Sequence, residues 1–122
     1  MMKSKNILVV DDEEDIRQLF TDLLSVRGHR VRCAGDGIDC GVEILKDRPD
    51  VILMDLKMPN MNGPKSVKYL KDGASKENKD IKIIIITGDM DLESMEVLEK
   101  YRVPYLLKPI NFPELYKLIE ED

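Results

Sequence analysis

The sequence predicts one doubly wound α/β domain, in which a five-stranded parallel sheet carries helices on both faces. Five short apolar runs alternate along the chain with five segments of helical periodicity, as in a series of right-handed βα units. One run is four consecutive isoleucines, Ile83 to Ile86, which is typical of a central parallel strand buried on both faces. The length of 122 residues suits a single domain.

The predicted strands are short, and polar or turn-forming residues bound each of them. The second strand alternates apolar and polar side chains, which favours an outer position in the sheet. The strands are predicted over residues 7–10, 31–34, 51–54, 83–86 and 105–107.

The first two predicted helices are recognised by their apolar stripes. The stripe of the first is Ile16, Leu19, Phe20, Leu23 and Leu24, followed by a stop at Gly28. The stripe of the second is Ile38, Val42 and Leu45, with Ile44 beside it. Gly41 in the middle of this second helix weakens it by about 1 kcal/mol relative to alanine.

The remaining helices have recognisable starts or stripes. The third begins at Gly63-Pro64, since proline in a first turn loses no intrahelical hydrogen bond, and a charged connector over residues 71–80 follows it. The fifth begins at Asn111, an N-cap with Glu114 three residues later. The apolar stripe of the third helix is Val67 and Leu70. That of the fourth is Leu92, Met95, Val97 and Leu98, and that of the fifth is Leu115, Leu118 and Ile119.

Composition excludes several classes of function. The net charge of −5 argues against a surface that binds nucleic acid directly. No apolar run approaches the roughly 20 residues that span a bilayer, and residues 1–6 are not followed by an apolar stretch of signal-peptide length, so we expect a cytoplasmic protein without a membrane partner. Cys33 and Cys40 suit small core positions in a reducing compartment better than a disulfide or metal site. His29 is expected in a solvated loop.

Charged and polar residues stand directly after four of the predicted strands. Asp11 and Asp12 follow the first, Asp55 the third, Thr87 ends the fourth, and Lys108 follows the fifth. Parallel strands end at one edge of the sheet, where open α/β sheets bind ligands, and the flavodoxin-like order 2-1-3-4-5 makes the first and third strands neighbours. Three carboxylates would then repel one another, which favours a bound cation, and their hard oxygen atoms suit Mg²⁺.

Each residue of this group has an ordinary explanation when it is taken alone. An acidic pair often ends a strand and caps a helix, a lysine after a strand is usually solvated, and a threonine there is usually a local cap. The joint occurrence of all of them after parallel strands is what favours a functional site.

Four segments together resemble the signatures of two-component response-regulator receiver domains. They are residues 9–13, residues 54–63 (Met-Asp-Leu-Lys-Met-Pro-Asn-Met-Asn-Gly), residues 86–88 and residues 107–110. The second segment is highly specific for this family, and the resemblance covers nearly the whole chain. It implies a phosphoprotein that forms one receiver domain over residues 1–122, without an effector domain. Chemotaxis regulators of this family are themselves an example of the 2-1-3-4-5 order.

The resemblance also implies a role for each residue of the strand-end group. Asp55 would be the phosphoacceptor, supplied by a sensor histidine kinase or a histidine phosphotransfer protein. Asp11, Asp12, Asp55 and the backbone carbonyl of Lys57 would hold Mg²⁺. Lys108 and the ion would neutralise charge on the transferred phosphoryl group. Such a domain assists only its own phosphorylation and dephosphorylation and is not an enzyme.

Other positions match the switching and lifetime elements of the family. Thr87 and Tyr105 correspond to the switch pair, in which the hydroxyl moves toward the phosphoryl group and the ring turns inward. Pro104 departs from the family pattern and predicts a stiffer turn before Tyr105. Lys57 and Asp89 match the two positions that tune phosphoryl lifetime, and their opposite charges would pair and slow hydrolysis.

The resemblance further implies a cis peptide bond before Pro109 and output through the fourth helix, fifth strand and fifth helix to an effector protein or domain. The chain is expected to be a monomer or a weak dimer. Two alternatives remain: a receiver-fold interaction module that is not phosphorylated, and a Mg²⁺-dependent phosphatase with Asp55 as its nucleophile. The intact strand-end group disfavours the first, and the absence of an Asp-x-Asp motif or a cap insertion disfavours the second.

Overall fold

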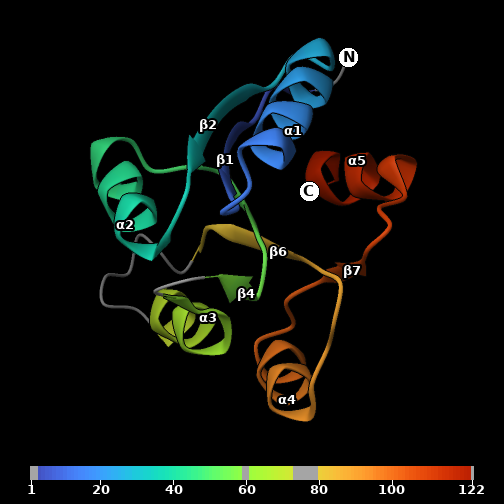
Figure 1. The fold of residues 1–122 in the computed structure, drawn as a ribbon. Coiled ribbons are helices and arrows are strands. Elements are labelled where there is room, and N and C mark those ends of the chain that lie inside the picture. Colours follow the sequence, from blue (N-terminus) through green and yellow to red (C-terminus); the bar gives the residue numbers. More distant parts are fainter. Residues whose placement is uncertain (1–2, 59–60, 73–79, 122) are drawn as a thin grey trace.

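The computed structural model describes residues 3–58, 61–72 and 80–121, which form a layered α/β domain (Figure 1). The main sheet has five parallel strands in the order β2-β1-β3-β6-β7, which confirms the predicted order 2-1-3-4-5. These strands are β1 (Asn6–Val10), β2 (Arg30–Ala34), β3 (Val51–Met54), β6 (Lys82–Thr87) and β7 (Tyr105–Leu107).

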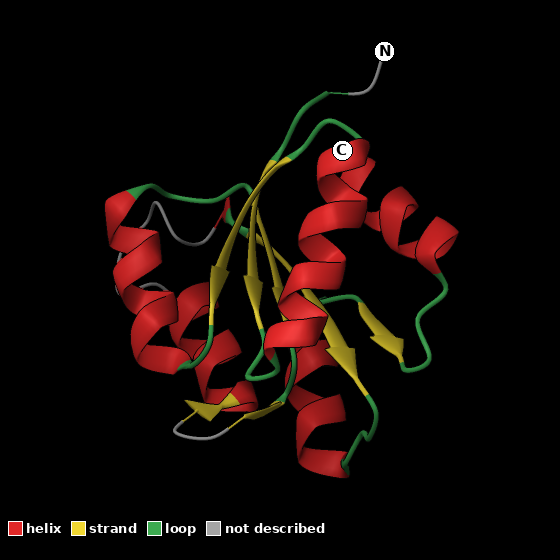
Figure 2. Cartoon of the chain, turned by 45° about the horizontal axis from the view of Figure 1, so that its top comes forward, coloured by secondary structure: helices red, strands yellow, loops and turns green. Residues whose placement is uncertain are grey.

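The five predicted helices are all present, and they lie on both faces of the sheet (Figure 2). They are α1 (Glu14–Val26), α2 (Gly37–Lys46), α3 (Gly63–Asp72), α4 (Leu92–Lys100) and α5 (Phe112–Glu120). The predicted cap of the last helix is confirmed, because the Asn111 side chain accepts a hydrogen bond of 3.0 Å from the backbone N–H of Glu114. None of the helices in the described part of the chain combines the length and apolar content needed to cross a bilayer.

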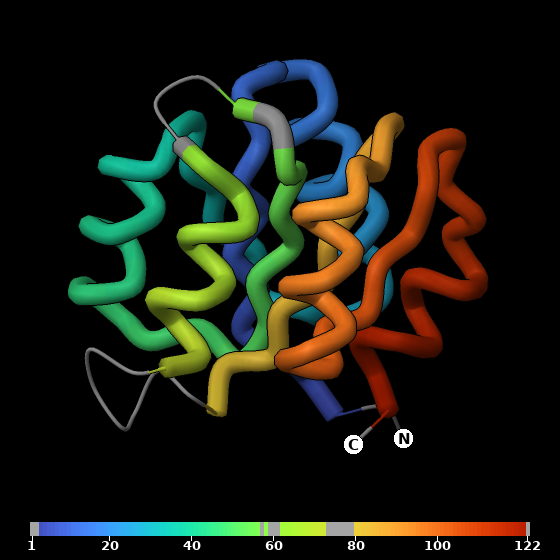
Figure 3. The backbone as a smooth tube through the Cα atoms, turned by 90° about the horizontal axis from the view of Figure 1, so that it is seen from below, coloured from blue at the N-terminus to red at the C-terminus, as the bar shows by residue number. Residues whose placement is uncertain are grey.

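Successive side chains of each strand point to opposite faces of the sheet, so the core has two halves. On one face, residues such as Leu8 and Ile83 pack against α2, α3 and α4, which lie side by side in Figure 3. On the other face, residues such as Ile7 and Ile84 pack against α1 and α5. The consecutive isoleucines thus fill both halves of the core, as predicted for a central strand.

A short hairpin that was not predicted stands between the main sheet and α3. It pairs β4 (Lys57–Met58) with β5 (Met61–Asn62) in an antiparallel arrangement. Strands of two residues carry no periodicity, so sequence patterns do not reveal them. The hairpin begins two residues after Asp55 and therefore starts close to the edge at which the main strands end.

The predicted apolar face of α2 is wrong. Ile38, Val42 and Leu45 point outward, with exposed fractions of 71%, 44% and 88%, whereas Cys40 is buried and Ile44 packs beside the core. Both sides of this helix are apolar, so periodicity alone does not tell which side meets the sheet. In α4, likewise, Leu98 and Ser94 are buried, but the predicted Leu92 and Met95 are exposed.

His29 is buried rather than solvated, which corrects the expectation from its turn-like neighbours. The backbone N–H of Lys5 donates to its Nδ1 (3.1 Å), and its Nε2 lies 2.9 Å from Oε2 of Glu120. Arg27 donates two hydrogen bonds to the same carboxylate, at 2.7 and 2.5 Å, and lies 4.2 Å above the ring of Tyr116. These partners are 91 and 93 positions apart in sequence, so no local pattern connects them.

This cluster predicts an acid-sensitive contribution to stability. The hydrogen bonds from Arg27, and secondarily His29, hold the pKa of Glu120 below its ordinary 4.5, although burial opposes the shift. The ionised carboxylate therefore stabilises the fold above pH 4.5, and this contribution is lost as the pH falls through the lower folded-state pKa. Glu120→Gln should lower the free energy of unfolding at neutral pH by about 2 kcal/mol.

Urea unfolding at neutral pH and at about pH 3 tests this prediction. The difference between wild type and Glu120→Gln should shrink at the acidic pH. The exposed Glu96→Gln on α4 is the matched control and should leave stability nearly unchanged. An equal difference at both pH values would contradict the assignment.

Candidate functional site

The strand ends meet at one edge of the sheet, and the register brings the predicted residues together there. Val10 at the end of β1 pairs with Met54 at the end of β3, so Asp11 and Asp55 follow neighbouring positions. The backbone N–H of Asp55 lies 3.4 Å from the carbonyl oxygen of Val10. On the other side, the backbone N–H of Lys108 donates to the carbonyl of Thr87 at 2.8 Å.

Asp55 and Lys108 form an ion pair at this edge. The Nζ of Lys108 lies 3.0 Å from Oδ2 of Asp55, and the two side chains are 35% and 13% exposed, respectively. Burial acts to lower the pKa of Lys108, but the hydrogen bond to Asp55 and the charges of Asp55 and Asp11 outweigh it and raise the pKa. The ammonium group therefore stays charged beside the carboxylate at neutral pH.

Asp11 is the most confined carboxylate of the site. Its residue is only 5% exposed, and its Oδ1 accepts a hydrogen bond of 2.9 Å from the backbone N–H of Glu13. Burial raises the pKa of Asp11, and the charges of Asp55 and Asp12 add to the rise, while the Glu13 hydrogen bond and Lys108 oppose it. The ionised form of Asp11 is therefore disfavoured, mainly by burial and to a smaller extent by the neighbouring carboxylates.

Arg17 is a supporting residue that the sequence did not reveal. Its guanidinium on α1 donates a hydrogen bond of 2.7 Å to the backbone carbonyl of Asp11. This contact ties the turn that carries Asp11 and Asp12 to the first helix. Arg17 follows Asp11 by six positions, in a helix whose polar face gave no reason to single it out.

The predicted switch residues lie on the last two strands. Thr87 is 1% exposed, and its hydroxyl donates to the backbone carbonyl of Asp89 at 2.9 Å. Tyr105, paired with Ile85 at the start of β7, is 43% exposed. The backbone carbonyl of the preceding Pro104 accepts a hydrogen bond of 3.0 Å from Ile85, so the proline is anchored to the sheet edge.

The remaining predicted residues surround this edge. Asp12 and Asp89 are exposed. Lys57 lies in β4, but its side chain falls outside the described residues, so its pairing with Asp89 stays a prediction. The Lys108–Pro109 peptide bond is cis, the isomer that the resemblance implies.

Gly63 at the start of α3 is packed against the residue that follows Asp55. A Cβ atom at this position would lie 2.8 Å from the Cα atom, the carbonyl oxygen and one methyl carbon of Leu56. Only glycine permits this approach of α3 to the loop after β3. Close packing against Leu56 therefore explains why the segment 54–63 ends in glycine.

An apolar cavity of about 220 Å³ adjoins the site on the side of α1 and α5. Its lining includes Leu19 and Phe20 of α1, Phe112 of α5, and Lys108 with Pro109 from the cis turn. The edge that carries Asp55 and Lys108 is therefore flanked by an apolar surface on the side of α1 and α5.

The comparisons with known proteins agree with this geometry. The family model for the response regulator receiver domain matches residues 7–120. Regulatory protein AtoC of Escherichia coli is 31% identical over 98% of this chain, which spans 25% of that protein. Sporulation initiation phosphotransferase F of Bacillus subtilis is 30% identical over 98% of this chain and 94% of its own length.

A solved structure gives the same assignment. The chemotaxis protein CheY4 of Vibrio cholerae superimposes with a TM-score of 0.83 at 30% identity, covering 96% of this chain and 97% of that one. This chain therefore belongs to the family of response regulator receiver domains, the signalling domains of two-component systems.

Proposed function

We propose that this domain accepts a phosphoryl group on Asp55 from a sensor histidine kinase or a histidine phosphotransfer protein and, once modified, controls an effector protein or domain. The main support is the 3.0 Å contact between Lys108 and Asp55 at the edge where β1 and β3 end. This contact sets a nucleophilic carboxylate beside a fixed positive charge. The proposed receiver unit extends over residues 1–122.

The proposed step is a phosphoryl transfer to a carboxylate oxygen. An oxygen of Asp55 bonds to phosphorus while the bond from phosphorus to the donor nitrogen, or to the oxygen of a small acyl phosphate, breaks and leaves its electron pair on the donor. The product is an aspartyl phosphate. Lys108 neutralises negative charge on the transferred group, so catalysis is mainly positional and electrostatic.

Mg²⁺ is the proposed cofactor, held by Asp11, Asp12, Asp55 and the backbone carbonyl of Lys57. The fit rests on the donor chemistry: hard carboxylate oxygens, and a buried Asp11 whose pKa is raised by burial and by its acidic neighbours. Among the described residues, no three acidic, histidine or cysteine side chains are grouped as a ready-made metal site. When bound, the ion would supply positive charge to the phosphoryl oxygens.

The proposed metal site predicts a stabilising effect of Mg²⁺. Millimolar Mg²⁺ should raise the melting temperature, because the ion relieves carboxylate repulsion and binds only the folded state. Asp11→Asn should also raise the melting temperature without Mg²⁺, since it removes a buried charge and keeps the oxygen that accepts from Glu13. In this variant the further gain from Mg²⁺ should be small.

Thermal unfolding with and without Mg²⁺ tests this pair of expectations. Asp12→Asn is the matched control for charge removal, because Asp12 is exposed and its replacement should stabilise the metal-free protein less. A wild-type melting curve unchanged by Mg²⁺ would contradict the proposed ligand set.

The proposed switch couples phosphorylation to the surface of α4, β7 and α5. The hydroxyl of Thr87 is held by the backbone of Asp89, and the ring of Tyr105 is exposed, which fits the state without a phosphoryl group. A phosphoryl group on Asp55 would attract the hydroxyl and give the ring room to turn inward. Pro104, anchored to Ile85, is expected to limit the backbone part of this motion.

The proposed cellular setting is the reducing cytoplasm. Cys33 and Cys40 are both free thiols, and burial raises the pKa of Cys40 to about 11. A protonated, buried thiol is unreactive, so oxidation of Cys40 does not enter the proposed function.

The test of the proposed function is the intact mass after incubation with acetyl phosphate and Mg²⁺. We expect wild type to gain one phosphoryl group and Asp55→Asn to gain none. Chelation of Mg²⁺ should suppress the gain in wild type. A folded wild-type protein that gains no mass would support the interaction module, and continuous release of phosphate from a foreign phosphoester would support the phosphatase.

A further inference from the structure

The outward side of α2 is an apolar stripe without cover in the domain. Ile38 is 71% exposed, Val42 44% and Leu45 88%, and they follow the i, i+4, i+7 spacing of one helix face. The opposite side of α2 already contributes Cys40 and Ile44 to the core. A surface helix usually has one apolar face, so the second one is unexplained by the fold.

Gly41 lies within the same stripe, and no packing inside the domain requires a glycine there. It stands in the middle of α2, where glycine weakens a helix, and a Cβ atom there would meet no atom within 4 Å. The fold would therefore accept alanine. The missing side chain leaves room on this surface for a second body whose backbone comes close to α2.

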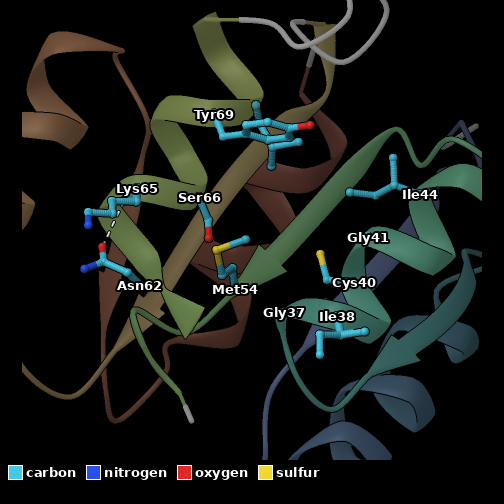
Figure 4. A pocket seen from close by; sticks show the side chains of 11 residues that line it. Gly37, Ile38, Cys40, Gly41, Ile44, Met54, Asn62, Lys65, Ser66 and Tyr69 are labelled. Carbon is cyan, nitrogen blue, oxygen red and sulfur yellow. Dashed lines mark hydrogen bonds between the residues drawn. The ribbon is translucent and has the colours of Figure 1, made fainter. Parts of the chain in front are cut away.

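A groove continues this surface toward α3. It has a volume of about 440 Å³, and Figure 4 shows Ile38, Cys40 and Ile44 on one wall and Tyr69 on the other. Tyr69 is 63% exposed. The apolar surface available to a partner thus extends beyond the stripe itself.

The stripe is complementary to the same stripe of a second copy when the two α2 helices pack antiparallel. About a midpoint between Gly41 and Val42, Ile38 falls opposite Leu45 of the second copy, and Gly41 falls opposite its Val42. Large side chains then meet at both ends, and each valine meets a glycine in the centre. This pattern fits a twofold contact, in which the same patch serves both subunits.

The charges beside the stripe match in the same arrangement. At 100° per residue, Asp39 and Lys46 lie on the same flank of the stripe, one near each end of α2. Antiparallel packing sets Asp39 of each copy beside Lys46 of the other, which gives two opposite-charge contacts. Lys46 also lies 3.2 Å from Oε2 of Glu43 in its own helix, an exposed contact that leaves its ammonium within reach of a second carboxylate.

We propose that α2 is a homodimer interface in which two copies pack antiparallel through Ile38, Gly41, Val42 and Leu45. Stable interfaces bury about 800 Å² per partner, more than the stripe of one three-turn helix provides, so the dimer is weak and dependent on concentration. The interface lies apart from the α4, β7 and α5 surface of the proposed switch. The proposal does not depend on phosphorylation of Asp55.

Sedimentation equilibrium of the full chain, up to roughly 1 mM, tests the proposal. Wild type should dimerise, and Leu45→Glu should weaken the dimer at least tenfold while circular dichroism stays unchanged. The control is Val26→Glu on α1, where the native side chain is 87% exposed but lies outside the stripe. A wild-type protein that is monomeric throughout, or equal effects of both variants, would overturn the proposal.

Charge reversal tests the antiparallel geometry separately. Asp39→Lys alone and Lys46→Asp alone should each weaken the dimer several-fold, and the double variant should restore the wild-type constant. Gly41→Ala should raise the melting temperature of the monomer and still weaken the dimer. If the double variant is as weak as the single variants, or if Gly41→Ala leaves the dimer unaffected, the arrangement is wrong.

Discussion

Replacement of Lys108 by alanine is expected to slow phosphorylation of Asp55 by acetyl phosphate by about 10²–10³-fold. Its ammonium lies 3.0 Å from the Asp55 carboxylate, where the charge of the transferred group would develop in the proposed reaction. Removal of one such preorganised charge typically has an effect of this size on the rate. The rate of mass gain at saturating Mg²⁺ measures it.

The same variant separates catalysis from metal binding. Lys108→Ala removes a positive charge that competes for Asp55, so Mg²⁺ should still raise the melting temperature of the variant. The matched control is Lys117→Ala, which replaces an exposed lysine on α5. We expect this variant to be phosphorylated at the wild-type rate. An unchanged rate in Lys108→Ala would remove this residue from the mechanism.

Gly63→Ala is expected to damage stability and phosphorylation together. The new Cβ would lie 2.8 Å from backbone atoms of Leu56, and backbone does not move aside as a flexible side chain does. We expect a loss of about 3 kcal/mol in the free energy of unfolding, typical of severe overpacking. Because Leu56 follows Asp55 directly, we expect the clash also to displace the proposed nucleophile, Asp55, from Lys108.

The opposite behaviour is expected of a second glycine in a helix. Gly41→Ala meets no neighbouring atom, and at low protein concentration it should stabilise the domain by up to about 1 kcal/mol. Urea unfolding of both variants compares the two positions directly. A Gly63→Ala protein as stable as wild type would show that α3 shifts without cost, contrary to the packing described.

The positions of the strands and the meeting of the site residues at one edge were predictable because both depend on short-range features, whereas the strand order came from the known doubly wound folds that the chain resembles. Apolar runs mark the strands, and each site residue stands within two positions of a strand end. Once the strands are parallel, their carboxyl ends share one edge, and Asp55 and Lys108 meet although they are 53 positions apart. The fourfold isoleucine run located the central strand without any knowledge of its partners.

The features that the sequence missed depend on contacts between distant segments. Burial of His29 requires Glu120, which lies 91 positions away. The inward face of α2 is Cys40 rather than the more apolar Leu45, because the packing of the helix on the sheet, and not its periodicity, decides which stripe is covered. Arg17 acts through a backbone carbonyl, a partner that leaves no signature in the sequence.

The most direct test of the central claim is the position of the phosphoryl group. Wild-type protein phosphorylated with acetyl phosphate and Mg²⁺ can be reduced with borohydride, which converts an aspartyl phosphate to homoserine, and then digested and sequenced by mass spectrometry. We predict homoserine at position 55 and at no other aspartate. Homoserine at Asp11 or Asp12, or its absence from a protein shown to be folded, would contradict the assignment of Asp55.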